Sequence, residues 1–397
     1  MPGPLAGIKI VDCSQIVSGP FAVMILADQG ADVIKVEPPG YGDLMRVGPY
    51  YRGGLSAFFA NVNRNKRCIV LDLTKPKGRE ILLELVREAD VFIQNWRPGA
   101  AERLGLGWED LRALNPRLIY CSVSGYGPSG PYSDRRVYDP IIQGITGHVA
   151  IQKNPDVPIP DLVRNIVADK STSWTAAQAI TAALFARLRG TAGGQHIVVP
   201  MIDSSLFFFW PDGMMKHTFV GEAERQLPVL YDTYRIYQTA DGHLIYFTAS
   251  ESEFHGLFRA LGKAEWCTDP RFATPQERSK TENRELLGGM ILEEIAKWPT
   301  RELIARMAAE QVPVGPVNSI EEMLVDPQIV HNDSWFEAEH ASAGRLRLPR
   351  PVARFSETPQ DVRRLPPLHG EHTAEVLREL GFDAAAQAQL RADGVIP

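Results

Sequence analysis

The chain opens with two short apolar segments, Gly7-Ile-Lys-Ile-Val-Asp12 and Asp32-Val-Ile-Lys-Val-Glu37, which flank residues 20–29. The isoleucines and valines of both segments predict strands. Residues 20–29 begin with a proline, carry apolar side chains at helical spacing and end before a glycine, which predicts a helix. This order predicts a βαβ unit with two parallel strands.

The alternation of strand-like and helix-like segments continues through the first half of the chain. Further strands are predicted at 69–72, 91–94, 118–124 and 195–199, and helices at 77–89, 108–114 and 171–187. Strands that alternate with helices favour a parallel sheet with helices on both faces. We therefore predict an α/β, doubly wound fold for this part.

The second half has a different pattern. The composition turns polar at 221–228, which predicts a domain boundary, and residues 234–248 form a predicted β-hairpin that turns at Asp241-Gly242. Helices are predicted at 252–262, 284–296 and 373–380, and a short strand or linker at 311–317.

Composition excludes several classes of protein. The 397 residues carry a formal net charge of −6, whereas nonspecific nucleic-acid binding needs a basic face. The four cysteines form no CxxC pair, which favours a reducing compartment. The first ten residues lack the pattern of a signal peptide, and no apolar run reaches about 18 residues. We therefore expect a cytoplasmic protein that spans no membrane.

The sequence supports neither a dinucleotide-binding site nor a metal site. The loop from Asp12 to Pro20 has one glycine instead of GxGxxG, so the βαβ unit is read as structural and not as a dinucleotide site. The sequence His369-Gly-Glu-His372 has an HxxH spacing, but neighbouring prolines and its glycine predict a surface turn before a helix cap at Thr373. No metal site is expected.

Asp169 is the main candidate for chemistry. It directly precedes the predicted Ala-rich helix at 171–187, where the helix dipole favours an anion. The alternative is that Asp169 is simply the N-cap of that helix. Ser171 or Thr172 could cap equally well, which would leave Asp169 free, so the pattern alone keeps both interpretations open.

The chain as a whole resembles the class III CoA-transferases, the family of the formyl-CoA and carnitine-CoA transferases. The resemblance includes Asn63-Arg-Asn-Lys-Arg67 and Asn95-Trp-Arg-Pro-Gly99. The other matching motifs keep the same order along nearly the whole chain, at residues 4–12, 18–20, 30–37, 42–43, 71–73, 103–105, 115–119, 122–127 and 368–373.

The resemblance implies an architecture. A large Rossmann-like, CoA-binding domain would combine residues 1–220 and 330–397, and a smaller inserted α+β domain would occupy residues 225–325. It also implies an interlocked homodimer, in which each chain threads through the other.

The resemblance also implies a mechanism at Asp169. A carboxylate can attack a thioester to form an aspartyl anhydride and then an aspartyl-CoA thioester, which passes CoA to an acceptor acid. An acyl-CoA thioester and a carboxylic acid would be substrates, with no permanently bound cofactor. Gln15 would lie near the active site, and a set of further residues would bind CoA: Thr74, Lys75, Asn95, Trp96, Arg97, Arg103 and Arg136.

The same superfamily contains 2-methylacyl-CoA racemases, which use a histidine within the segment that here reads Arg136-Val-Tyr-Asp139. Tyr138 matches the transferases instead, because a phenol with a pKa of about 10 is poorly suited to that proton transfer. Glu251 lies in a segment that resembles a racemase active-site segment, although it could be an ordinary first-turn acid of a helix.

The formyl-CoA transferases carry a run of glycines that is missing at 220–260, which argues against formyl-CoA and oxalate as substrates. Two alternatives remain open: racemase or epimerase chemistry, and a noncatalytic CoA-binding protein.

Overall fold

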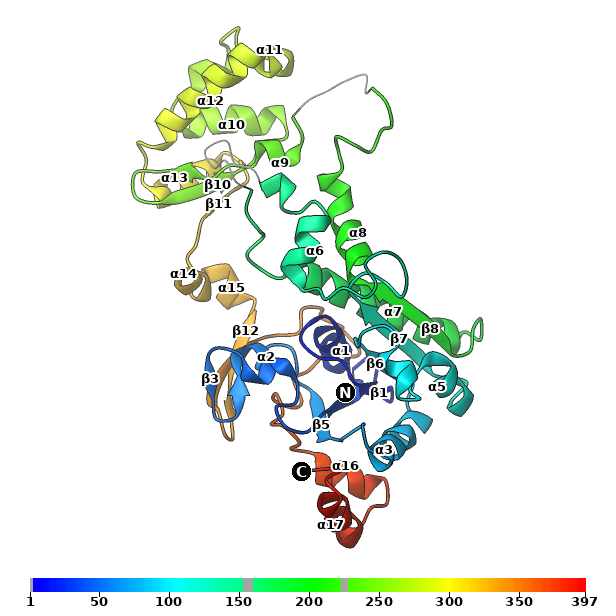
Figure 1. The fold of residues 1–397 in the computed structure, drawn as a ribbon. Helices are drawn as coiled ribbons and strands as arrows, with labels where there is room; N and C mark the ends of the chain where they lie inside the picture. Colours follow the sequence, from blue (N-terminus) through cyan, green and yellow to red (C-terminus); the bar gives the residue numbers. More distant parts are fainter. Residues whose placement is uncertain (1–2, 153–159, 223–227) are drawn as a thin grey trace. The chain divides into compact units, whose positions relative to one another are not determined.

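The computed structural model describes residues 3–152, 160–222 and 228–397 (Figure 1). They belong to two compact units. The first unit comprises Met1–Glu224 and Asp333–Pro397, and the second comprises Arg225–Asn332.

A parallel six-stranded sheet forms the centre of the first unit, in the order β5-β2-β1-β6-β7-β8. Its strands are β1 (Lys9–Asp12), β2 (Asp32–Glu37), β5 (Lys66–Val70), β6 (Val91–Gln94), β7 (Ile119–Ser124) and β8 (Gln195–Pro200). The predicted α/β class with a parallel sheet is confirmed. The strand order reverses between β1 and β6, so this pair is the topological switch point of the sheet.

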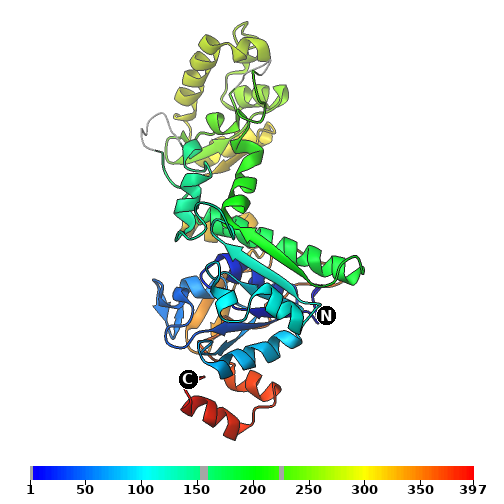
Figure 2. The ribbon, with the colours of Figure 1, turned by 45° about the vertical axis from the view of Figure 1, so that its right-hand side comes forward.

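Helices cover both faces of this sheet (Figures 1 and 2). One face packs against α1 (Ser18–Asp28) and α7 (Val167–Leu188). The other packs against α3 (Pro76–Arg87), α5 (Trp108–Leu114), α16 (Thr373–Glu379) and α17 (Ala384–Ala392). Alternate strand residues point to opposite faces: Val91 and Ile93 face α1 and α7, whereas Phe92 faces the other layer.

The last residues of the chain are part of this core. Val395 and Ile396 are buried with the side chains of α3. The Asp72 N–H donates to the Val395 carbonyl at 2.9 Å. The segment after residue 333 therefore completes a layer that the first half of the chain begins.

The first unit also contains shorter elements around the sheet. These are η1 (Leu44–Val47), β3 (Tyr51–Arg52), β4 (Leu55–Ser56), α2 (Ala57–Ala60), α4 (Ala100–Arg103), α6 (Asp139–Ile145), η2 (Ala150–Gln152), α8 (Met201–Gly213), and the antiparallel pair β12 (Trp335–His340) and β13 (Gly344–Pro349). The sequence patterns did not predict α6, α8 or this hairpin. Pro211 lies inside α8, and an internal proline is ordinarily a helix breaker.

The second unit has a three-stranded antiparallel sheet and its own core. The predicted hairpin is confirmed, with shorter strands, as β9 (Tyr237–Gln238) and β10 (His243–Tyr246), and β11 (Val314–Pro316) pairs on the other side of β10. Its helical elements are α9 (Leu230–Thr233), α10 (Glu251–Ala260), η3 (Ala264–Cys267), α11 (Pro275–Ser279), α12 (Thr281–Ile295), α13 (Thr300–Ala309), α14 (Ile320–Leu324) and α15 (Pro327–His331). In the part of the chain that the structure describes, no helix combines the length and apolar character needed to cross a membrane.

Candidate active site

Asp169 lies inside the first turn of α7 and not ahead of the helix. The helix begins at Val167, four residues earlier than predicted, so Asp169 is not its N-cap. Ser171 and Thr172 do not cap it either, because both hydroxyls donate backwards to the Ala168 carbonyl, at 3.0 and 2.7 Å. Both capping interpretations were therefore wrong.

The backbone of this turn is capped from another helix. The Asp139 carboxylate, at the start of α6, accepts a hydrogen bond from the Asp169 N–H at 2.9 Å. The Asp169 carboxylate is consequently not needed as a cap. It accepts a short hydrogen bond from the Ser18 hydroxyl at the start of α1, and Asp169 is only 6% exposed.

The environment of Asp169 changes its acidity. Burial raises its pKa to about 6, hydrogen bonds from Ser18 oppose the rise, and the nearby Asp139 carboxylate adds to it. At neutral pH the Asp169 carboxyl group is still mostly ionised. Its protonation state depends on burial, Ser18 and Asp139, and not on the helix N-terminus alone. A buried carboxylate with a raised pKa is a common feature of catalytic sites.

The loop between β1 and α1 lies at the switch point of the sheet. The Gln15 N–H donates to the Asn95 side-chain oxygen at 2.8 Å, and the Asn95 amide donates to the Gln15 carbonyl at 2.7 Å. The Gln15 side chain makes no hydrogen bond to another described residue and is partly exposed. In open α/β sheets, ligands bind beyond the carboxyl ends of the strands at such a point.

The residues that the resemblance assigns to CoA follow the ends of the neighbouring strands. Thr74 bonds to Asp72 after β5, and Lys75 precedes α3 with its ammonium group against the Asp393 carbonyl. Trp96 follows β6 and its ring lies edge-on to Phe92. These residues lie at the carboxyl edge of the sheet.

The three arginines of that set are exposed and available. Arg97 follows β6, Arg103 ends α4, and Arg136 lies in the loop before α6. None of their guanidinium groups is ion-paired with another described residue. A free guanidinium suits a phosphate group because it offers several donors in one plane.

Tyr138 and Glu251 have different surroundings. Tyr138 is the residue before α6, is 56% exposed and is the immediate neighbour of Asp139. Glu251 begins α10 in the second unit, where its carboxylate pairs with the buried Arg278.

The HxxH segment makes protein contacts. The His369 ring contacts the Pro38 carbonyl at 3.1 Å, and the His372 ring accepts from the Cys68 N–H at 3.2 Å. The helix cap is His372 and not Thr373, which is the first residue of α16 and whose hydroxyl accepts from the Val70 N–H. Across residues 3–152, 160–222 and 228–397, no group of three or more His, Cys, Asp or Glu is arranged to hold a metal ion.

Two residues of the site had no role assigned from the sequence. Ser18 stood within a matching motif, and Asp139 stood beside Tyr138, but nothing local linked either of them to Asp169. They lie 151 and 30 residues away from it in the chain. Only tertiary structure brings their side chains to the first turn of α7.

Comparison with known proteins identifies the family. Residues 5–373 match the model of CoA-transferase family III. An acyl-CoA transferase of Fusarium pseudograminearum is 37% identical, with 99% of this chain and 88% of that protein covered. The human succinyl-CoA:glutarate CoA-transferase is 32% identical, with 99% and 90% covered. The crystal structure of a CAIB/BAIF family protein from Brucella suis superposes with a TM-score of 0.82 at 33% identity, covering 96% of this chain and 100% of that one.

The chain therefore belongs to CoA-transferase family III, as the sequence motifs indicated. It is an enzyme of the CoA-transferase class, with a place in acyl-CoA metabolism.

Proposed function

We propose that this enzyme moves CoA from an acyl-CoA thioester to a carboxylic acid through covalent intermediates on Asp169. The observation that carries the proposal is the buried Asp169 carboxylate, held by Ser18 at the start of one helix and freed from capping by Asp139. Burial strips water from the carboxylate, and a raised pKa makes it a better nucleophile.

The reaction divides into four balanced steps. A carboxylate oxygen of Asp169 attacks the thioester carbonyl, the C–S bond breaks, and CoA thiolate leaves a mixed anhydride. The thiolate attacks the Asp169 carbonyl carbon, releasing the donor acid and leaving an aspartyl-CoA thioester. The acceptor carboxylate then attacks this thioester and expels the thiolate. The thiolate finally attacks the acyl carbon of the new anhydride, which yields the product thioester and free Asp169.

Other residues support these steps. The Gln15 side chain at the switch point makes no hydrogen bond to any other residue that the structure describes, so its amide can donate to an oxyanion that forms there. Lys75, Arg103 and Arg136 supply positive charge for the CoA phosphates in a net-acidic chain. Thr74, Asn95, Trp96 and Arg97 are proposed to complete the nucleotide site, and Tyr138 to lie near the acyl group.

A homodimer belongs to the proposal. Several large apolar side chains of α7 and α8 are exposed in the single chain: Phe185, Leu188, Phe207, Phe208 and Trp210. Apolar groups of this size gathered on two adjoining helices favour a covered interface. Sedimentation or light scattering of the purified protein should give twice the chain mass.

The decisive experiment is to trap the intermediate. The protein is incubated with acyl-CoA thioesters, quenched with hydroxylamine or borohydride, digested and analysed by mass spectrometry. Succinyl-CoA with glutarate is the first pair to test, because the human relative is named for it. Modification of the peptide that contains Asp169, and loss of CoA exchange in Asp169→Ala with CoA binding retained, are expected. Exchange that survives in Asp169→Ala would reject the mechanism.

The racemase alternative is tested in the same samples. It predicts incorporation of deuterium from heavy water at the carbon next to the thioester, without any label on Asp169. A phenol is poorly suited to take up a proton near neutral pH, so Tyr138, at the position where the racemases have a histidine, favours the transferase. A noncatalytic protein would bind CoA and give neither signal.

A further inference from the structure

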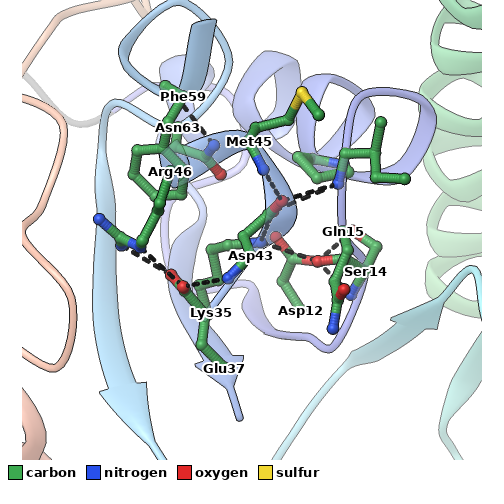
Figure 3. Close-up of polar contacts among 12 residues, drawn as sticks. Asp12, Ser14, Gln15, Lys35, Glu37, Asp43, Met45, Arg46, Phe59 and Asn63 are labelled. Carbon is green, nitrogen blue, oxygen red and sulfur yellow. Dashed lines mark hydrogen bonds and ion pairs between the residues drawn. The ribbon is translucent and has the colours of Figure 1, made fainter. Parts of the chain in front are cut away.

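Six charged side chains form a buried network beside the β1–α1 loop (Figure 3). They contribute three negative and three positive formal charges, and none is more than 5% exposed. The members are Asp12, Lys35, Glu37, Asp43, Arg46 and Lys66.

The contacts join strands β1, β2 and β5 with η1 and with Asp43, the residue before it. Lys66 pairs with Asp12 at 2.9 Å, and Lys35 pairs with Asp43 at 3.0 Å. Arg46 pairs with Glu37 at 2.7 Å, and Glu37 also accepts from the Asp43 N–H at 2.8 Å. Burying so many charges costs desolvation free energy, and apolar residues would often stabilise a core equally well. Stability alone is therefore a weak reason for this network.

The network ends on the backbone of the loop (Figure 3). Asp12 accepts from the Ser14 N–H at 2.9 Å, and Lys35 donates to the Ser14 carbonyl at 2.7 Å. Asp43 accepts from the Ile16 N–H at 3.0 Å. Since Asn95 binds both backbone groups of Gln15, side chains hold every backbone N–H and carbonyl of residues 14 and 15.

Ile16 needs such a restraint. Its φ is +72°, in the left-handed region that a β-branched residue strongly disfavours. A strained residue persists only where its surroundings fix it, and such residues cluster at functional sites. Ile16 is the link between Gln15 and the start of α1, where Ser18 contacts Asp169.

We propose that Asp43, held in place by Lys35, is a positioning residue for the transferase reaction. Its carboxylate keeps Ile16 in the left-handed conformation, which holds the Ser18 hydroxyl against the Asp169 carboxylate and fixes the backbone from which the Gln15 amide extends. The inference rests on the proposed function of Asp169, and it adds a role for charged residues that never touch the substrate.

The test compares Asp43→Ala, Ile16→Gly and the double variant, assayed with succinyl-CoA and glutarate. Asp43→Ala should lower kcat about 10- to 100-fold, because small misplacements of reacting groups are costly. KM for the thioester should change less than about threefold, since CoA is held elsewhere. Glycine adopts positive φ freely, so the double variant should regain roughly fivefold in kcat over Asp43→Ala.

A second readout does not depend on turnover. Amide hydrogen exchange in the peptide that contains Ile16 should accelerate in Asp43→Ala and stay slow in the matched control Asp28→Asn. Asp28 also forms a buried ion pair, with Arg64 at 2.7 Å, but among the described residues it makes no hydrogen bond or ion pair with the loop. The control should lose thermal stability and keep its kcat. If Asp43→Ala does not fold, Asp43→Leu replaces it, because leucine has nearly the shape of aspartate and lacks the oxygen that accepts from the Ile16 N–H.

The outcomes separate the two proposals. Wild-type kcat in a folded Asp43 variant, or a double variant no faster than the single, would overturn the positioning role. Turnover in Asp169→Ala, measured in parallel, would reject the covalent mechanism instead. If wild-type protein does not use the chosen substrate pair, the exchange rates at Ile16 still decide whether Asp43 restrains the loop.

Discussion

Gln15 and Asn95 exchange two hydrogen bonds between the loops that follow β1 and β6, the two strands at which the sheet order reverses. One side-chain amide thus binds both backbone groups of the other residue. This contact joins the two loops that border the proposed site. The Gln15 side chain, which bonds to no other residue in the described parts of the chain, is the group that we propose to act on the substrate.

Removing this contact should impair catalysis more than folding. Asn95→Ala loses both hydrogen bonds, so we expect kcat to fall about tenfold or more as the Gln15 loop loosens. The matched control is Asn115→Ala, since Asn115 also binds two backbone carbonyls, of Val86 and Ala89, away from the site. Both variants should lose about 1–2 kcal/mol of unfolding free energy in denaturant titrations. Equal kcat in the two variants would contradict the assignment.

The acidic limb of the pH–rate profile should report on Asp169. The proposed mechanism needs the ionised carboxylate, whose pKa is about 6, so it predicts that kcat/KM rises with pH through that value. Asp139→Asn removes a negative neighbour and should shift the limb to lower pH. Ser18→Ala removes a hydrogen bond to the carboxylate and should shift it to higher pH.

Profiles measured with one substrate pair across pH 4–9 would check these opposite shifts. Asp161→Asn, which removes the charge from an exposed ion pair with Arg164, is the control and should leave the limb in place. Shifts of the same sign in Asp139→Asn and Ser18→Ala would contradict the electrostatic account.

The buried Asp169 carboxylate should also reduce stability. Its folded pKa, about 6, lies above the ordinary value of 3.8 for an aspartate side chain, so the folded state binds its proton more tightly. The resulting penalty is fully present above pH 6 and is relieved as the pH falls towards 4. Asp169→Asn should therefore raise the free energy of unfolding at pH 8 by up to about 3 kcal/mol.

Thermal melts of wild type and Asp169→Asn at several pH values would measure this effect. The gain at pH 8 should shrink at pH 5. A variant that is less stable than wild type at pH 8 would show that packing of the carboxylate, and not its charge, dominates.

The exposed arginines should affect binding instead of chemistry. Arg103→Ala and Arg136→Ala should each raise KM for the acyl-CoA about tenfold with little change in kcat, because a phosphate contact acts equally in ground and transition states. Arg112→Ala, which removes an exposed partner of Glu109, serves as the control. Steady-state kinetics at two ionic strengths would test this, since high salt should reduce the difference.

Local sequence patterns predicted the strands of the parallel sheet and most of the helices that cover it. They gave wrong bounds where a charged residue pairs with a residue far away in the chain. The third predicted strand, 69–72, actually begins at Lys66, because the Lys66 ammonium is matched by Asp12, 54 residues earlier. Likewise, α7 begins four residues early because Asp139 caps it from 30 residues away. Sequence patterns predict that a charged residue is exposed. Such a residue can be buried only where the tertiary structure supplies a partner of opposite charge.

The same limit applies to the site. Asp169 could be singled out from its place near an Ala-rich helix and from family motifs. Its partners Ser18 and Asp139 could not, because hydrogen bonds between segments leave no periodic signal. The ion pairs around Asp43 could not be predicted either, because the sequence does not show which acidic residue pairs with which basic residue.

Burial of Val395 and Ile396 against the side chains of α3 has a consequence for how the protein is made. During translation, the sheet of the first unit emerges early but lacks part of one covering layer until residue 396 has left the ribosome. Residues 225–332 have a hydrophobic core of their own and can fold before that moment. The first unit therefore keeps apolar surface exposed until Val395 and Ile396 have been synthesised and can pack against it.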